Sequence, residues 1–248
     1  MRELLKDKVC IVTGSARGIG RAIAELYANE GADVIVNDNR PGSADEWIEK
    51  SEDRDRLHTC YFDITDPSAV RQNVMEIKKQ FGHIDVLVNN AGVEFNELIG
   101  MISRDNMERM FSVNVYGTIE MIQTVSRIMS RNENGGSIIN ISSMVGLRGN
   151  AGQLVYSATK GAVIALTRSA AKELASKGIR VNSIAPGLTQ TEMMEQADLD
   201  KLQGRIGNIC MGRIAQPTDI AGACLLLASD HAGYISGQII PVDGCTIM

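Results

Sequence analysis

Strand-length apolar runs alternate along most of this 248-residue chain with longer segments whose apolar residues recur at helical spacing. The runs are rich in Val and Ile with few polar residues between them, which is typical of strands covered on both faces of a sheet. We predict strands at Lys8–Thr13, Asp33–Asn37, His58–Phe62, Ile84–Asn89, Ser137–Ser142, Ile179–Ala185 and Gln238–Val242. Helical patterns occupy Gly18–Asn29, Pro67–Phe81, Arg104–Arg131, Gln153–Ser176 and Pro217–Ser229.

This order of elements restricts the topology. Repeated strand–helix–strand units form a parallel sheet with helices on both faces, and right-handed crossovers then leave a doubly wound arrangement. We therefore predict a single α/β domain over residues 1–248, built on a doubly wound seven-stranded parallel sheet. Residues 190–210 have weaker periodicity, so we expect a substrate-lid insertion near residues 188–212. The charged stretch Arg40–Arg56 is expected to be a solvated loop with a short helix.

Composition and charge argue against several classes of protein. The net charge is -5 and no basic stripe is present, so nucleic-acid binding is not expected. The first eight residues lack a signal-peptide pattern and no apolar stretch reaches the length of a membrane span, which predicts a cytoplasmic protein without a membrane partner. Five widely spread cysteines without a Cys-x-x-Cys pair predict reduced thiols and no metal site.

A glycine-rich turn, Thr13–Gly20, joins the first predicted strand to the first helix. Such a turn lets the backbone approach a pyrophosphate, with the N–H groups and positive end of the helix facing the anion. Gly14 would permit the tight turn, Gly18 the close approach and Gly20 the packing of helix on strand. The spacing G-x-x-x-G-x-G differs from the usual G-x-G-x-x-G, and a plain glycine-rich turn is the alternative.

Asp38 ends the second predicted strand, where a carboxylate can accept hydrogen bonds from both adenosine ribose hydroxyls. A carboxylate there would also repel the 2′-phosphate of NADP(H), so we favour NAD(H). A loop-capping aspartate is the alternative. Arg17 or Arg40 could instead hold a 2′-phosphate, and Arg17 could pair with Asp38 or stay solvated.

Candidate catalytic residues gather in the middle of the sequence. Tyr156 and Lys160 are spaced i, i+4 on one predicted helix face, and Ser142 and Ser143 follow the fifth strand. Asn114 stands in an apolar helical pattern, where a buried amide must be hydrogen-bonded. Each feature alone has an ordinary structural explanation: a surface pair, a helix cap or a kink. Their joint occurrence at these places indicates proton chemistry.

Reduction of a ketone explains these residue types. The alkoxide formed by hydride addition needs a proton, and tyrosine, with a pKa near ~10, is a poor donor and acceptor near neutrality. Lowering its pKa by about three units requires about 4 kcal/mol of differential stabilisation. We expect the Lys160 ammonium to supply part of it, a serine hydroxyl to polarise the carbonyl, and Asn114 to hold a water in a proton path.

Together these motifs resemble the short-chain dehydrogenase/reductase family over nearly the whole chain, which implies a Rossmann-type fold. Besides the glycine-rich turn and the tetrad of Asn114, a serine, Tyr156 and Lys160, the matching segments are Asn89–Gly92, Asp63-Ile64 and Pro186-Gly187 followed by Thr189 and Thr191. The resemblance implies cofactor contacts at Gly14, Ser15, Arg17, Gly18, Ile19, Gly20, Asp38, Asp63, Ile64, Asn90, Ala91, Gly92, Tyr156, Lys160, Pro186, Gly187, Thr189 and Thr191.

Within the family, the motifs are most similar to those of bacterial 3-oxoacyl-acyl carrier protein reductases. In these relatives the catalytic serine precedes the tyrosine by thirteen residues, which selects Ser143 and leaves Ser142 to support the loop. The resemblance also implies a homotetramer joined through the two long helices and the C-terminal strand. Those reductases mostly use NADP, however, and hold their acidic carrier with basic residues, for which Arg131 and Lys177 are approximate candidates and Asn134 stands in place of an arginine.

The leading hypothesis is therefore an oxidoreductase for a small-molecule ketone or secondary alcohol, with a 3-oxoacyl thioester on a carrier protein or coenzyme A as the best candidate. A sugar, polyol or steroid is the alternative substrate, and several methionines (Met101, Met144, Met193, Met194 and Met211) suggest an adaptable apolar pocket. A dinucleotide-binding sensor without catalysis is the alternative from another class.

Overall fold

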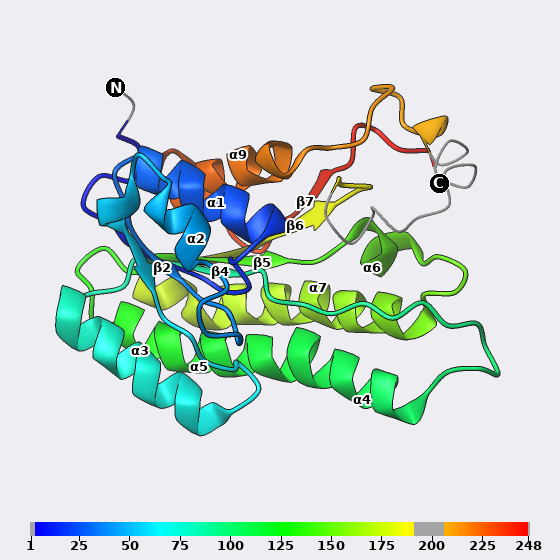
Figure 1. The fold of residues 1–248 in the computed structure, drawn as a ribbon, viewed down its shortest axis with the longest axis horizontal. Coiled ribbons are helices and arrows are strands. Elements are labelled where there is room, and N and C mark those ends of the chain that lie inside the picture. The colour runs from blue at the N-terminus through cyan, green and yellow to red at the C-terminus, as the bar shows by residue number, and fades with distance from the viewer. Residues whose placement is uncertain (1–2, 191–205, 248) are drawn as a thin grey trace.

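The computed structural model describes residues 3–190 and 206–247. A seven-stranded parallel sheet with the strand order β3-β2-β1-β4-β5-β6-β7 forms its centre (Figure 1). The strands are β1 (Val9–Val12), β2 (Asp33–Val36), β3 (Leu57–Thr59), β4 (Val86–Asn89), β5 (Gly136–Ile141), β6 (Ile179–Pro186) and β7 (Ile239–Val242). The predicted doubly wound parallel sheet is confirmed.

Helices cover both faces of this sheet (Figure 1). One layer contains α1 (Gly18–Asn29), α2 (Asp45–Glu49) and α9 (Pro217–Ala228), and the other contains α3 (Pro67–Phe81), α4 (Arg104–Phe111), α5 (Thr118–Met129) and α7 (Leu154–Leu174). The short α6 (Met144–Arg148) follows β5, and the remaining short helices are η1 (Arg54–Arg56), η3 (Ala175–Lys177) and η5 (Asp230–Ala232). Among the described residues, no helix is long and apolar enough to cross a membrane.

Alternation along the strands divides the apolar residues between two cores. In β1, Cys10 and Val12 belong to the core under α1 and α9, whereas Val9 and Ile11 belong to the core under α3, α5 and α7. Because successive side chains of a strand point to opposite faces, a strand buried on both sides must be apolar throughout. This explains the continuous Val and Ile runs of the sequence.

The order in which successive strands are added to the sheet changes direction between β1 and β4. The chain builds β1, β2 and β3 outward on one side and then returns to place β4 on the other side of β1. Loops leaving the carboxyl ends of β1 and β4 therefore diverge, and a crevice forms between them. The turn after Val12 and the segment after Asn89 face each other across this crevice.

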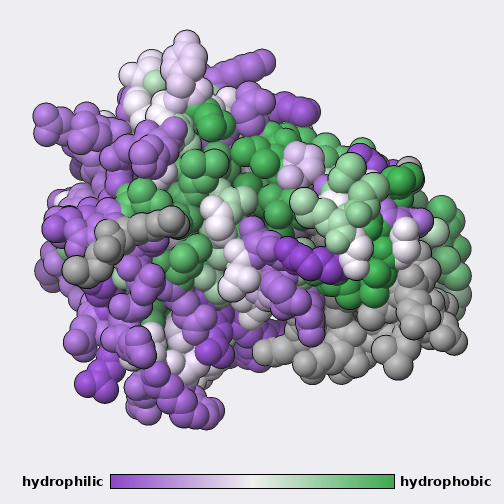
Figure 2. Space-filling model, turned by 90° about the horizontal axis from the view of Figure 1, so that it is seen from above, coloured by the Kyte–Doolittle hydropathy of each residue, from purple (hydrophilic) through white to green (hydrophobic). Residues whose placement is uncertain are grey.

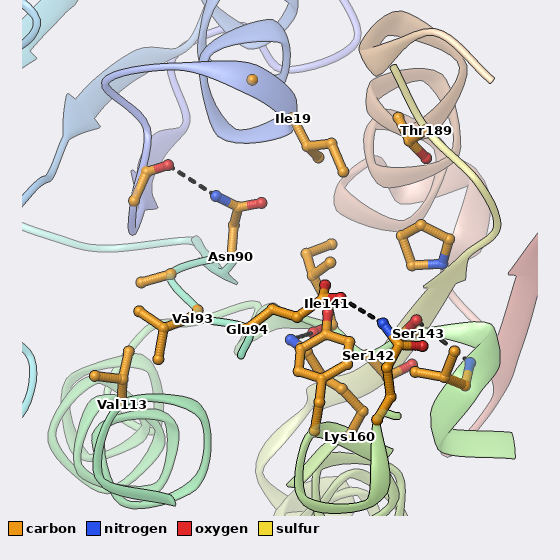
Figure 3. Close-up of a pocket in the computed structure, with 18 of the residues that line it drawn as sticks. Ile19, Asn90, Val93, Glu94, Val113, Ile141, Ser142, Ser143, Lys160 and Thr189 are labelled. Atoms are coloured by element: carbon orange, nitrogen blue, oxygen red, sulfur yellow. Dashed lines mark hydrogen bonds between the residues drawn. The ribbon is translucent and has the colours of Figure 1, made fainter. Parts of the chain in front are cut away.

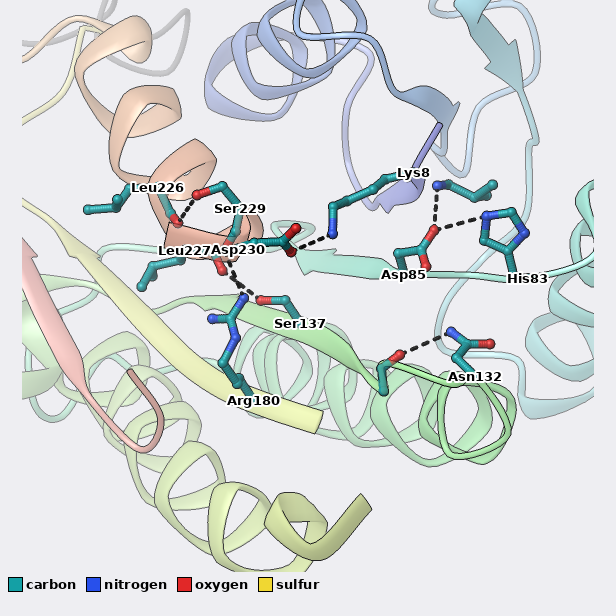
Figure 4. A network of polar contacts seen from close by, with 12 residues as sticks. Lys8, His83, Asp85, Asn132, Ser137, Arg180, Leu226, Leu227, Ser229 and Asp230 are labelled. Atoms are coloured by element: carbon teal, nitrogen blue, oxygen red, sulfur yellow. Dashed lines mark hydrogen bonds and ion pairs between the residues drawn. The ribbon is translucent and has the colours of Figure 1, made fainter. Parts of the chain in front are cut away.

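The opposite, amino-terminal edge of the sheet is closed by polar contacts (Figure 4). Lys8 Nζ pairs with Asp230 Oδ1 at 2.8 Å, and Asp85 Oδ2 accepts a hydrogen bond from Val9 N at 2.8 Å. Ser137 Oγ donates to the carbonyl of Leu227 at 2.9 Å, joining β5 to the end of α9. These contacts fix the ends of several strands and leave the carboxyl edge as the open one.

The predicted helix Arg104–Arg131 differs from the structure. It consists of α4 and α5 joined by a π-helical segment, η2 (Ser112–Gly117), which includes Asn114. The apolar pattern does not reveal this wider turn, in which the hydrogen bonds run from i to i+5. A second difference is α6, whose five residues are too few to show a helical period.

A buried chain of side-chain hydrogen bonds connects β4, β5 and α7. Asn89 Nδ2 donates to Asn140 Oδ1 at 2.8 Å, and Asn140 Nδ2 donates to Thr167 Oγ1 at 2.9 Å. The Thr167 hydroxyl in turn donates to the carbonyl of Val163 at 2.7 Å. All three side chains are buried and have lost their hydrogen bonds to water. The hydrogen bonds of this chain take the place of those bonds.

We expect Thr167→Val to lower the free energy of unfolding by about 1–3 kcal/mol, because Asn140 Nδ2 would be left buried without an acceptor. Urea denaturation monitored by circular dichroism measures the change. Thr167→Ser keeps the hydroxyl and is the control, with a smaller loss expected from the missing methyl group alone. Equal losses in the two variants would contradict a contribution from the hydrogen-bond chain.

Candidate active site

A cleft of about 1540 Å³ runs along the carboxyl edge of the sheet. It extends from the turn before α1, past the ends of β2 and β4, to the segment after β6. Pockets for a single small molecule measure roughly 300–1,000 Å³, so this cleft suits an elongated ligand together with a second one. Its two ends have different chemistry.

The first end is shaped by close backbone packing in the glycine-rich turn. A Cβ on Gly20 would lie 2.4 Å from the carbonyl oxygen of Gly14, and one on Gly14, which has a φ of +61°, would lie 2.7 Å from Ala91 Cα. Asn90 Nδ2 donates to the carbonyls of Thr13 and Gly14 at 3.0 and 2.8 Å and so joins β4 to the turn. In α1, which is described throughout, the first turn has no acidic side chain. The free helix end and the close turn fit a pyrophosphate.

The structure brings most of the predicted cofactor residues together. Those that line the cleft are Gly14, Arg17, Gly18, Ile19, Asp38, Asp63, Ile64, Asn90, Ala91, Gly92, Tyr156, Lys160, Pro186, Gly187 and Thr189. Ser15 and Gly20 lie behind the wall of the cleft, where Ser15 Oγ donates to the carbonyl of Val12 at 2.7 Å. Thr191 lies outside the described residues.

Asp38 lies at the end of β2 with its side chain largely buried. Its Oδ1 accepts hydrogen bonds from Arg40 N at 3.1 Å and Arg40 Nε at 3.3 Å. The Arg40 guanidinium is mostly exposed, so the pair contributes little to stability by itself. The two hydrogen bonds from Arg40 nevertheless define the position of the Asp38 carboxylate at the edge of the cleft.

The two serines after β5 have separate environments. Ser142 is buried, and its hydroxyl donates to the carbonyl of Ile184 at 2.9 Å and accepts from Ser183 Oγ at 2.9 Å. Ser143 caps α6, where its Oγ accepts from Val145 N at 3.4 Å, and its side chain lies near enough to Tyr156 to lower the pKa of that phenol. Both serines line the cleft, and of the two it is the Ser142 hydroxyl that is bound to the sheet through Ile184 and Ser183.

Tyr156 and Lys160 share the first turns of α7, as their spacing predicts (Figure 3). Lys160 is 4% exposed, and its Nζ donates to the carbonyl of Ile141 at 2.8 Å. The same nitrogen lies 5.7 Å from the centre of the Tyr156 ring. The ammonium is therefore close to the ring and fixed to the end of β5.

The pKa shifts of this pair differ from the expectation based on sequence. Burial raises the pKa of Tyr156 well above its ordinary value, the charge of Glu94 raises it further, and only the hydrogen bond from Ser143 lowers it. Burial also lowers the pKa of Lys160 to about 8, against a smaller opposing effect of Glu94. In the free cleft Tyr156 keeps its proton, because the lysine does not offset the loss of solvation.

Asn114 lies outside the cleft, behind one wall. Its Oδ1 accepts from Val93 N at 2.8 Å, while its Nδ2 donates to the carbonyl of Val93 at 2.9 Å and to Thr159 Oγ1 at 3.1 Å. The amide thus holds the chain after Gly92 and the helix face that includes Lys160. Asn114 is a positioning residue in this structure.

A carboxylate that had no assigned role in the sequence analysis also lies in the cleft. Glu94 follows the Asn89–Gly92 motif and lines the cleft, and its side chain extends toward Ser143 (Figure 3). Its Oε1 accepts a hydrogen bond from Gln153 Nε2. Nothing in the sequence indicated that the Glu94 side chain points into the cleft.

The basic residues considered for carrier binding lie at the other edge of the sheet. Arg131 follows α5 and Lys177 is the last residue of η3, just before β5 and β6 begin, so both are at the amino edge and away from the cleft of the same chain. Arg109 and Arg148 line the cleft instead.

Comparisons with known proteins agree with this geometry. The family model described as "Enoyl-(Acyl carrier protein) reductase" matches residues 14–245. The 3-oxoacyl-(acyl-carrier-protein) reductase of Thermotoga maritima is 38% identical over 97% of this chain and 98% of its own, and that of Staphylococcus aureus is 39% identical over 96% and 97%. A 3alpha-hydroxysteroid dehydrogenase of Mediterraneibacter gnavus is 36% identical over 98% of both chains.

We expect Lys160→Met to show how much the burial of the Lys160 ammonium lowers the free energy of unfolding. The lysine has a pKa of about 8 in the folded protein and 10.5 as its ordinary value, so between these limits the unfolded chain binds more protons and folding is favoured as the pH rises. From pH 8 to 10.5 the unfolding free energy of the wild type should increase relative to the variant by up to about 3 kcal/mol. Urea denaturation at several pH values measures this difference.

Lys172→Met removes an exposed lysine of the same helix and is the matched control. Its difference from the wild type should stay constant over the same pH range. A constant difference for Lys160→Met as well would show that the buried ammonium has no energetic cost.

Proposed function

The chain belongs to the short-chain dehydrogenase/reductase family, and we propose that this oxidoreductase reduces the ketone of a 3-oxoacyl thioester to a secondary alcohol with a nicotinamide dinucleotide. The observation that supports the proposal most directly is that Ser143, Tyr156 and Lys160 line the same cleft as the glycine-rich turn, with Lys160 Nζ 5.7 Å from the centre of the Tyr156 ring. The names of the Thermotoga maritima and Staphylococcus aureus relatives support the substrate class.

In the proposed reaction, the dinucleotide supplies the hydride that adds to the carbonyl carbon. Tyr156 donates its hydroxyl proton to the carbonyl oxygen, and its raised pKa keeps that proton available. Ser143 orients the same oxygen and stabilises the negative charge that develops on it. Lys160 holds a hydroxyl of the ribose and places positive charge beside the phenol. Asn114 holds the chain after β4 and helix α7, the two walls of the site, in their relative positions.

A secondary alcohol of another kind is the second candidate substrate. The Mediterraneibacter gnavus relative is named for a steroid, and Glu94 puts a carboxylate at the reacting end that an unsubstituted acyl chain would not need. The two segments beside the proposed lid, near Thr189 and Ile209, also line the cleft. We propose that the segment 188–212, of which residues 191–205 lie outside the described part of the chain, covers the substrate.

We propose NAD(H) as the preferred dinucleotide because Asp38 presents a fixed carboxylate at the adenosine end of the cleft. Two ribose hydroxyls can donate to it, whereas a 2′-phosphate would meet a like charge. Arg40, the residue best placed to hold a 2′-phosphate, is instead paired with Asp38.

We also propose a homotetramer in the cytoplasm. On the side of the molecule formed by α1 and α9, apolar side chains gather over part of the surface (Figure 2). The long helices expected at the interface also have exposed large apolar side chains, Ile119 in α5 and Leu154 in α7. All five cysteines are free thiols, as a reducing compartment requires.

Steady-state reduction of the N-acetylcysteamine thioester of acetoacetate tests the proposed function. We expect turnover by the wild type and a loss of at least about 10³-fold in kcat for Tyr156→Phe, because the phenylalanine cannot transfer a proton. NADH binding to the variant, followed by fluorescence, should change little. Undiminished turnover in Tyr156→Phe contradicts the assignment, and NADH binding without turnover of any ketone by the wild type would favour a sensor.

Replacing Asp38 tests the cofactor preference. We expect Asp38→Ser to raise the ratio of kcat/KM for NADPH over NADH by about tenfold or more, since it removes the repulsion and frees Arg40 to meet the phosphate. Initial rates with each cofactor measure the ratio. A wild-type enzyme that already prefers NADPH would refute the NAD(H) proposal directly.

A further inference from the structure

Glu94 is fixed in place by contacts on either side of it. The backbone of Val93 is held at both its N–H and its carbonyl by Asn114, at 2.8 and 2.9 Å. Three residues later, Glu97 N donates to the carbonyl of Gly152 at 2.8 Å. The chain that presents the Glu94 side chain therefore cannot swing away from the cleft without breaking these bonds.

The carboxylate itself is oriented from behind. Gln153, which is 8% exposed, donates to Glu94 Oε1 through its amide nitrogen. The amide oxygen of Gln153 accepts from Asn150 Nδ2 at 2.7 Å, which fixes the orientation of the amide. The orientation of this carboxylate is therefore already fixed before a ligand binds, which is preorganisation.

No cation neutralises this carboxylate among residues 3–190 and 206–247. Gln153 is its hydrogen-bond partner there, and Lys160, though near enough to be affected by its charge, forms no ion pair with it. A negative charge at this place also disfavours ionisation of Tyr156. For the proposed reaction the carboxylate is therefore unfavourable, because it opposes proton release from Tyr156, unless a substrate forms a hydrogen bond with it.

We propose that Glu94 is a substrate-recognition residue that accepts a hydrogen bond from a hydroxyl group next to the reacting carbonyl. Glu94 and Tyr156 both line the cleft, and Figure 3 shows the Glu94 side chain extending toward Ser143, the residue proposed to orient the carbonyl oxygen. A carboxylate oxygen has lone pairs left after Gln153 is bound, and a hydroxyl donor satisfies one of them. A substrate without a donor leaves the charge desolvated and unpaired.

This inference rests on the proposed function and narrows it to hydroxylated ketones. For a 3-oxoacyl thioester the hydroxyl would be on carbon 4, the neighbour of the ketone away from the thioester. Polyhydroxylated ketones meet the same requirement. A plain apolar acyl chain does not.

The test compares substrates that differ only by a hydroxyl in place of a methyl group. One pair is 4-hydroxy-3-oxobutanoyl and 3-oxopentanoyl N-acetylcysteamine, and the other is hydroxyacetone and 2-butanone. For each pair, the ratio of kcat/KM is measured in the wild type, Glu94→Ala and Glu94→Gln. Comparing the ratios between proteins removes the intrinsic reactivity of the two ketones.

We expect Glu94→Ala to lower the preference for the hydroxylated member by about tenfold or more, since a site built for a hydroxyl discriminates through that bond. Glu94→Gln keeps the shape and should lower it less, because a neutral acceptor remains. Glu173→Ala removes an exposed carboxylate from the far end of α7 and should leave the ratio unchanged.

An unchanged ratio in a folded Glu94→Ala or Glu94→Gln that still binds NADH would overturn the inference. Failure of the proposed function gives a different result: the wild type would reduce neither thioester, while the hydroxyacetone and 2-butanone pair would still report the effect of Glu94.

Discussion

The side-chain amide of Asn114 ties together the two walls of the reacting end of the cleft. One wall is the chain after β4, held at both backbone groups of Val93, and the other is α7, held through Thr159. An amide buried to this degree must use its donors and its acceptor, and these partners supply them. Asn114 thereby holds the chain that presents Glu94, whereas Gln153 orients the Glu94 carboxylate and the carbonyl of Ile141 holds Lys160 Nζ.

The sequence predicts the sheet well because both of its faces are buried, so the strands must be nearly all apolar. It also predicts that Tyr156 and Lys160 share the first turns of one helix, whereas the catalytic role of Ser143 remains a prediction. It does not predict the π-helical turn around Asn114, since that conformation depends on Val93 and Thr159, which are distant in the chain. Nor does it predict the direction of the Glu94 side chain, which the contact with Gln153 decides.

The electrostatics of the free cleft differ from those inferred from spacing alone. A lysine one helical turn away suggests an acidic phenol, but burial affects both groups and opposes the charged form of each. Tyr156 therefore keeps its proton and Lys160 holds its own less firmly than a solvated lysine. The free site therefore holds the proton that reduction consumes, but a raised pKa makes the phenol a weaker acid. Proton transfer in either direction requires positive charge near the phenol that stabilises the phenolate.

Relatives named for different substrates have nearly the same identity to this chain. The Thermotoga maritima 3-oxoacyl reductase is 38% identical and the Mediterraneibacter gnavus steroid dehydrogenase 36%, each over almost the full length. Sequence identity of this kind reflects the shared sheet, turn and proton-transfer residues, and these do not distinguish one ketone from another. Specificity is a difference between binding free energies, and the hydroxyl-binding role proposed for Glu94 is one way in which this cleft would discriminate between ketones.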